Sequence, residues 1–200
     1  MSIVSRGFKG RRSDGDSGRV PPGQYLTGDF PVLTAGPTPG VDLEEWSLVL
    51  DGEIDQPRRW SWDDFLKLPA EAFTCDIHCV TKWSKLDTAW EGVSLDVILD
   101  GVDTAAEYLI AQSWGGYTTN LPLEDVVDRK AWIAYRYGGE PLDPEHGGPA
   151  RLLVPHLYLW KSAKWIRRLT LVAEDSPGFW ESNGYHNRGD PWKEERYWGD

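Results

Sequence analysis

The sequence predicts an α+β fold, in which one mixed domain combines short helices with mixed β-sheets. Strand-like apolar segments are scattered along the chain, and the helical segments between them are short and separately capped. Strands do not alternate regularly with long helices, which argues against a doubly wound parallel sheet. The individual elements, taken in chain order, support this class.

The first elements follow a polar N-terminal region. Glycine, proline and charged residues dominate residues 1–40, so we predict a flexible leader over residues 1–24 and a single domain over residues 25–200. Residues 25–32 are expected to pack against this domain as an extended arm. A strand is predicted over residues 46–51, where every second residue is Trp or Leu.

Short helices with recognisable caps come next. Ser61 and Asp64 form a capping-box pattern that opens a helix reaching Pro69. Ser94 caps a second helix over residues 95–99. A third helix is predicted over residues 123–128, strands over residues 108–111, 132–137, 151–154 and 165–172, a tight turn at residues 114–117, and an ordered loop after Pro177.

The composition fits one domain and argues against several kinds of partner. The chain has 200 residues, of which 40% are hydrophobic, so it can bury a core without disulfides. The formal net charge is −11, which argues against nucleic acid and anionic membrane surfaces. No integral membrane segment and no export signal are predicted, so a cytoplasmic location is expected, and one domain without a dimerisation module favours a monomer.

Two cysteines and a histidine lie close together in the segment 73–84. Zinc ligation by Cys75, His78 and Cys79 fits poorly, because no second Cys or His pair follows at the spacing of a zinc site. Cys75 falls in a predicted strand and is interpreted as a core residue. Cys79 lies just past that strand, beside His78 and Lys82, and two interpretations stay open: a small buried side chain, or a reactive thiolate that could bind a soft metal.

Three segments resemble the sulfite oxidase superfamily in their order and spacing. The first is His78-Cys79-Val80-Thr81-Lys82-Trp83-Ser84, followed by Trp90-Glu91-Gly92-Val93. The second is Gly139-Glu140-Pro141-Leu142 with residues 146–155, and the third is Lys161-Ser162-Ala163-Lys164-Trp165-Ile166. The chain looks most like the bacterial sulfite oxidase-like oxidoreductases and the catalytic subunit of protein-methionine-sulfoxide reductase.

This resemblance implies a molybdenum cofactor with one molybdopterin, a pyranopterin that holds the metal through its dithiolene. Cys79 matches the position of the cysteine that ligates molybdenum and is therefore the implied catalytic and metal-binding residue. A soft thiolate suits such a metal, which keeps it deprotonated. Cys75 does not match this position.

The resemblance also implies a set of cofactor contacts. Arg151 and His146 match contacts to the phosphate and the pterin, and an arginine fork suits a phosphate. Without the resemblance, His146 would be interpreted as a turn residue and Arg151 as a surface charge. The remaining implied contacts are His78 beside the ligand, Ser113 at a position where related reductases carry threonine, the tripeptide Ser162, Ala163 and Lys164, and Lys161 as a neutralising charge.

Two features depart from the family pattern. The Asn of the family's N-terminal cofactor contact is replaced by Asp29-Phe30-Pro31-Val32. Sulfite oxidases surround their anion with arginines, whereas only Lys82 follows Cys79 closely here. Aromatic residues near the metal, among them Trp83, Tyr117 or Tyr158, would suit a neutral S-oxide or N-oxide better than sulfite.

The predicted function is oxygen-atom transfer to or from a small-molecule substrate, with an external electron donor or acceptor. The alternative is a binding module: a domain of this fold that is structural, or that retains molybdopterin without turnover. The 12 tryptophans fit a large flat ligand. Trp83, Trp90, Trp114, Trp160 and Trp165 are predicted to line its cleft, and Trp46, Trp60 and Trp62 to pack in the core, while Trp132, Trp180, Trp192 and Trp198 have no assigned role.

Overall fold

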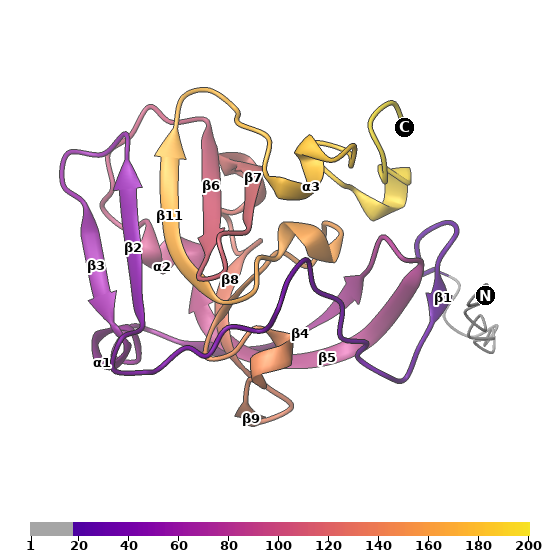
Figure 1. Cartoon of the computed structure of the whole chain (residues 1–200), viewed down its shortest axis with the longest axis horizontal. Helices are drawn as coiled ribbons and strands as arrows, with labels where there is room; N and C mark the ends of the chain where they lie inside the picture. Colours follow the sequence, from indigo (N-terminus) through magenta and orange to yellow (C-terminus); the bar gives the residue numbers. More distant parts are fainter. Residues whose placement is uncertain (1–17) are drawn as a thin grey trace.

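A computed structural model describes residues 18–200, and it folds into two mixed β-sheets with short helices (Figure 1). Residues 1–17, which form most of the predicted leader, lie outside the described residues. Two described leader residues contact the domain: Arg19 bonds Asp76 at 2.6 Å and Asp87 at 2.7 Å, and Gln24 is buried. Among the described residues, no helix has the length and apolar character needed to cross a membrane.

The strands form one six-stranded and one five-stranded sheet. In the larger sheet the order is β1 (Tyr25–Leu26), β5 (Trp83–Ser94), β8 (Trp132–Tyr137) and β10 (Arg151–Leu153), with β4 (Glu71–His78) paired to β5 and β9 (Glu140–Pro141) paired to β8. In the smaller sheet the order is β3 (Arg58–Ser61), β2 (Ser47–Gly52), β11 (Ile166–Val172), β6 (Tyr108–Ser113) and β7 (Thr118–Pro122). The pairs β1–β5 and β2–β11 are parallel and the others antiparallel.

The helices are all short. They are α1 (Trp62–Phe65), α2 (Leu95–Ile98) and α3 (Phe179–Ser182), with the 3-10 helices η1 (Leu123–Asp125), η2 (Pro144–His146), η3 (Leu159–Lys161) and η4 (Pro191–Lys193). The predicted α+β class is confirmed. The caps predicted for the first two helices are also present, because Ser61 Oγ accepts from the amide of Asp64 at 3.2 Å and Ser94 Oγ from that of Asp96 at 3.1 Å.

The third predicted helix, over residues 123–128, is wrong beyond Asp125. Only the 3-10 turn η1 forms, because Asp128 and Arg129 adopt positive φ angles of 59° and 56°. Their amides donate to the carboxylate of Asp96 at 2.8 Å each instead of continuing a helix. A carboxylate distant in sequence thus replaces the carbonyl acceptors that the helix would have supplied.

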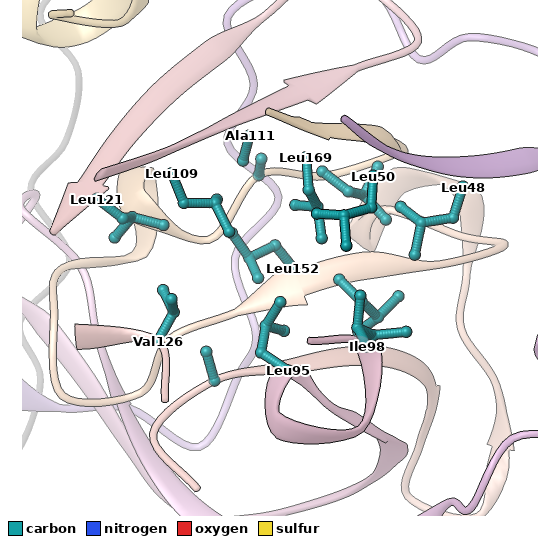
Figure 2. Close-up of a cluster of buried hydrophobic side chains, with 14 of the residues drawn as sticks. Leu48, Leu50, Leu95, Ile98, Leu109, Ala111, Leu121, Val126, Leu152 and Leu169 are labelled. Carbon is teal, nitrogen blue, oxygen red and sulfur yellow. The ribbon is translucent and has the colours of Figure 1, made fainter. Parts of the chain in front are cut away.

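The main core lies between the two sheets and α2 (Figure 2). Leu48, Leu50 and Leu169 of the smaller sheet face Ile98 of α2, and Leu152 of the larger sheet lies among them. A second, smaller apolar cluster occupies a different part of the larger sheet. It contains Ile77, Cys79, Trp83, Trp90, Ala134, Leu142 and Leu153.

The C-terminal tail is fixed to the body of the domain and lies on the same side as β1 (Figure 1). The amide of Tyr158 donates to the carbonyl of Gly189 at 2.8 Å, and Arg196 Nη2 donates to the carbonyl of Pro22 at 3.2 Å. Arg188 donates two hydrogen bonds of 3.0 Å to the buried carboxylate of Asp125. The tail therefore connects the N-terminal arm to the centre of the molecule.

Asp125→Asn should destabilise the protein at neutral pH by about 2 kcal/mol, because Arg188 and His156 lose a charged acceptor. Burial alone would raise the pKa of Asp125, but hydrogen bonds from His156 and Arg188 outweigh it and hold the pKa well below its usual range. The folded-state pKa is lowered, so this stabilisation is complete above about pH 5 and is lost as the pH falls below about 4 toward the folded-state pKa.

Urea unfolding of wild type and Asp125→Asn should therefore show a stability difference at pH 7 that shrinks as the pH approaches about 2. Glu124→Gln is the matched control, because Glu124 is the exposed neighbouring carboxylate. A difference of equal size at both pH values would contradict the assignment.

Candidate cofactor site

Cys79 lies in the tight turn between β4 and β5, at the edge of the smaller apolar cluster. The Cys79 amide donates to the carbonyl of Trp83, and the Lys82 amide donates to the carbonyl of Cys79, both at 2.9 Å. Lys82 adopts a φ of 77°, which lets the chain reverse within the turn. The hairpin therefore fixes the cysteine backbone on both sides.

Cys79 is only 7% exposed, and its sulfur accepts hydrogen bonds. The Thr81 hydroxyl donates to Sγ at 3.1 Å, and the backbone amides of Val80 and Thr81 donate to it as well. Burial raises the pKa of the thiol, while these donors and the charge of Lys164 act in the opposite direction. Such donors suit a sulfur that becomes a thiolate when it binds a metal.

Gln24 approaches Cys79 from the N-terminal arm, a contact that the sequence did not predict. Its side-chain Nε2 donates to the carbonyl of Cys79 at 3.1 Å, and its Oε1 is buried without a partner among the described residues. Arm and cysteine turn are 55 residues apart in sequence, so spacing gave no signal for this pair.

His78, the last residue of β4, is 4% exposed. Its Nδ1 lies 2.8 Å from Ser84 Oγ on the neighbouring strand β5. Burial lowers the pKa of His78 to about 4, so the imidazole is neutral at neutral pH. The ring thus links the two strands on either side of the cysteine turn, which agrees with the predicted orienting role and equally with that of a satisfied core histidine.

Arg151 is almost fully buried and ties together two segments of the predicted site. Its guanidinium donates to the carbonyls of His146 and Ser162 at 2.8 Å each, and to that of Leu152 at 3.3 Å. The interpretation of Arg151 as a surface charge is therefore wrong. All three hydrogen bonds go to neutral carbonyls in the described part of the chain, and burial lowers the pKa of the guanidinium to about 10. A buried cation of this kind favours a nearby anion.

His146 and Ser113 present buried polar atoms that no described residue satisfies. The ring of His146 stacks on Phe30 with a centroid separation of 4.0 Å, and its Nδ1 has no hydrogen-bond partner. Ser113 Oγ and the neighbouring Trp114 Nε1 are also buried without partners. Buried polar groups are rarely left unpaired in folded proteins, so these atoms fit a polar ligand.

Lys164 joins the N-terminal arm to the loop that carries His146. Its Nζ donates to the carbonyls of Leu33 at 2.8 Å and Glu145 at 2.6 Å. Burial, followed by the charge of Arg151, lowers the pKa of Lys164 to about 8. The positive charge of Lys164 favours the thiolate of Cys79 and the neutral form of His146.

The tripeptide containing Lys164 is held by the strand β10 and the loop that follows it. The carbonyl of Ala163 accepts from the Leu152 amide at 2.8 Å, and Ser162 Oγ accepts from the Val154 amide at 2.9 Å. The structure therefore brings Ser162, Ala163 and Lys164 beside Arg151, and the cofactor contacts implied for the tripeptide stay predictions.

Lys161 is not brought together with the other predicted residues. Its ammonium is completely buried and lies 2.6 Å from Glu181 Oε1. It also donates to the backbone carbonyl of Asn120 at 2.8 Å and to Asn120 Oδ1 at 3.1 Å. These partners use all three of its donors. In this structure the charge of Lys161 is neutralised inside the protein, so a contact with a phosphate stays only a prediction.

The tail places further aromatic residues near Cys79 that the sequence did not assign. Burial raises the pKa of Tyr185, and the negative charges that Tyr197 and Cys79 carry when deprotonated raise it further. The ring of Trp192 lies 6.5 Å from that of His78. Trp46 is buried in the main core and Trp60 and Trp62 pack against it, as predicted.

Within residues 18–200, no three His, Cys, Asp or Glu side chains are grouped so that they could hold a metal ion. The cofactor implied for this fold needs only one ligand from the protein. The donors around Cys79, the buried cation of Arg151 and the unsatisfied atoms of Ser113 and His146 fit such a group.

Comparison with known proteins identifies the family to which this fold and site belong. The family described as "Oxidoreductase molybdopterin binding domain" matches residues 35–180. The chain therefore belongs to the oxidoreductase molybdopterin-binding domain family, and the resemblance to the sulfite oxidase superfamily is confirmed.

Individual relatives agree with this assignment. The chain is 48% identical over 192 residues to "Uncharacterized oxidoreductase YuiH" of Bacillus subtilis, covering 94% of this chain and 96% of the relative. It is 30% identical to the protein-methionine-sulfoxide reductase catalytic subunit MsrP of Pseudomonas syringae pv. tomato, over 76% of this chain and 50% of MsrP. It is 28% identical to the sulfite oxidase of Arabidopsis thaliana, over 75% of this chain and 48% of that protein.

A solved structure shares the fold. The sulfane dehydrogenase SoxCD of Paracoccus pantotrophus superposes with a TM-score of 0.62 at 25% sequence identity, over 68% of this chain and 40% of that chain. The chain thus spans about half the length of MsrP and of the plant sulfite oxidase, and less than half of the SoxCD chain.

Glu181→Gln should destabilise the cofactor-free protein by about 3 kcal/mol, because it leaves the buried ammonium of Lys161 without its counter-charge. The double variant Lys161→Met with Glu181→Gln should lose less free energy of unfolding than the single variants Lys161→Met and Glu181→Gln lose in sum. Urea unfolding is measured for the wild type, the two single variants and the double variant, with Glu174→Gln at an exposed position as the control. If Glu181→Gln leaves the cofactor-free protein as stable as wild type, the internal pair has no structural role.

Proposed function

We propose that this chain is a molybdenum-cofactor-dependent oxidoreductase that transfers an oxygen atom to or from a small substrate. The observation that carries the proposal is the setting of Cys79, a buried sulfur that accepts hydrogen bonds from Thr81 and Val80. Its position matches the ligand cysteine of the sulfite oxidase superfamily, to which the resemblance is confirmed. The cytoplasmic location and the monomeric state stay predictions.

The proposed cofactor contacts are residues whose buried polar atoms or charges lack a matching partner among the described residues. When bound, molybdopterin holds molybdenum through its dithiolene and supplies the redox chemistry. Cys79 is the proposed metal ligand, and Ser113 Oγ and His146 Nδ1 are free to bond the pterin, because each is buried without a partner. Arg151 and Lys164 supply positive charge for the phosphate, with the backbone of Ser162 and Ala163 beside them.

The protein's part in the reaction is to orient groups and to control their charge. Arg151 fixes the carbonyls of His146 and Ser162, so the two loops on either side keep one relative position. The neutral imidazole of His78 holds Ser84 and keeps the cysteine turn in register between β4 and β5. Burial of Cys79 limits access of water to its sulfur.

The substrate class follows from the charges and rings beside Cys79. Lys82 is a single exposed cation on the cysteine turn, and Trp192 and Tyr185 of the tail lie close by. Aromatic rings, with Lys82 as the one cation on the cysteine turn, suit a neutral S-oxide or N-oxide better than a sulfite anion, which sulfite oxidases surround with several arginines. The 30% identity to the protein-methionine-sulfoxide reductase subunit MsrP supports this preference, with an external electron donor. Sulfite-type oxidation is the second candidate, supported by the similarity to sulfite oxidase.

Protein purified after expression with molybdate should contain about one molybdenum and one pterin per chain, and should reduce S-oxides or N-oxides with an artificial electron donor. Cys79→Ala should lower turnover at least about 100-fold, because the metal loses its protein ligand. Cys75→Ala, the matched control, should keep the metal and the activity. A wild-type protein without molybdenum would refute the proposal, and one with cofactor but no turnover on S-oxides, N-oxides or sulfite would favour the binding module.

His146→Ala should reduce pterin occupancy about 10-fold under limiting cofactor supply, because one buried hydrogen bond and the stacking surface next to Phe30 are lost. Ser113→Ala should act in the same direction. Pterin fluorescence after denaturation measures the content, and His156→Ala serves as a histidine control. Unchanged occupancy in both site variants would exclude these residues as cofactor contacts.

A further inference from the structure

Thr81 is the side chain that contacts the Cys79 sulfur most directly. Its hydroxyl donates to Sγ at 3.1 Å. Among the described residues, the hydroxyl makes no other hydrogen bond. Thr81 itself is exposed, so water could have satisfied this hydroxyl. The hydroxyl nevertheless points at the sulfur, which gives the contact a role that packing does not explain.

Hydrogen bonds fix the backbone of the turn that carries Thr81. The carbonyl of Cys79 accepts from Lys82 at 2.9 Å and from Gln24 at 3.1 Å, and the amide of Cys79 is bonded to Trp83. With the backbone fixed at these points, the Thr81 hydroxyl lies within hydrogen-bond distance of the sulfur. The hydrogen bond is therefore part of the same rigid turn that positions Cys79.

Three donors converge on the sulfur, but only one of them comes from a side chain. The amides of Val80 and Thr81 belong to the backbone and persist in any variant. The Thr81 hydroxyl can be removed by mutation without altering the backbone donors. Hydrogen bonds to a metal-bound sulfur withdraw electron density from it and thereby tune the metal.

We propose that Thr81 is a positioning residue that sets the reduction potential of the molybdenum centre through its hydrogen bond to the Cys79 sulfur. This inference rests on the proposed function, because it requires Cys79 to bind the metal. The hydrogen bond stabilises the more electron-rich reduced state, so its presence makes the reduction potential more positive. Thr81 itself neither ligates the metal nor exchanges a proton.

The test uses the molybdenum-loaded protein with Thr81→Val, which keeps the shape but removes the donor, and Thr81→Ser, which keeps the hydroxyl. Molybdenum per chain, the sulfur-to-molybdenum charge-transfer absorption and a potentiometric titration are measured for each. Thr81→Val should retain the metal, shift the potential to more negative values and move the absorption band to longer wavelength. Thr81→Ser should have a reduction potential and an absorption band close to those of the wild type.

Thr74→Val is the control, because Thr74 is an exposed threonine on β4 away from the cysteine turn. It should leave the potential and the absorption band unchanged. The inference is overturned if molybdenum-loaded Thr81→Val has the reduction potential and the absorption band of the wild type. It is also overturned if Thr81→Val and Thr81→Ser shift both quantities equally. In either case the proposed function stands. A wild-type protein that carries no molybdenum overturns both.

Discussion

The buried guanidinium of Arg151 is the interaction on which the rest of the site depends. It sits at the start of β10 and bonds carbonyls on two different loops, those of His146 and Ser162. A cation removed from water must be compensated, and here three carbonyl dipoles do so only in part. The domain therefore holds a positive charge in its interior at the point where we propose that the cofactor phosphate binds. If the two loops separated, this guanidinium would lose its carbonyl acceptors.

The N-terminal arm and the C-terminal tail close around this centre from opposite ends of the chain. Gln24 bonds the carbonyl of Cys79, while Leu33 accepts from Lys164. The tail returns over the same region and is fixed to the arm through Arg196. Their contacts are individually small, so the arrangement depends on many of them acting together.

The electrostatics of the site divide between two kinds of cation. Lys161 forms a buried ion pair with Glu181 at 2.6 Å, although it belongs to the same short segment as Lys164. Lys164 Nζ donates hydrogen bonds only to carbonyls among the described residues and lies 5.5 Å from the centroid of the Trp165 ring. Its charge acts on both Cys79 and His146. Two lysines that lie three residues apart in one motif thus have different partners: a buried carboxylate for Lys161 and backbone carbonyls for Lys164.

The sequence by itself determined the α+β class and the helix caps at Ser61 and Ser94, and its resemblance to a known family singled out Cys79 as the proposed metal ligand. These depend on local patterns or on motifs of contiguous residues. Only the tertiary structure decided that Gln24 and Thr81 converge on Cys79, that Lys161 turns inward to Glu181, and that the helix after Leu123 stops early. Each of these outcomes depends on side-chain direction or on a hydrogen-bond partner supplied by a different part of the fold, and residue spacing carries no information about either.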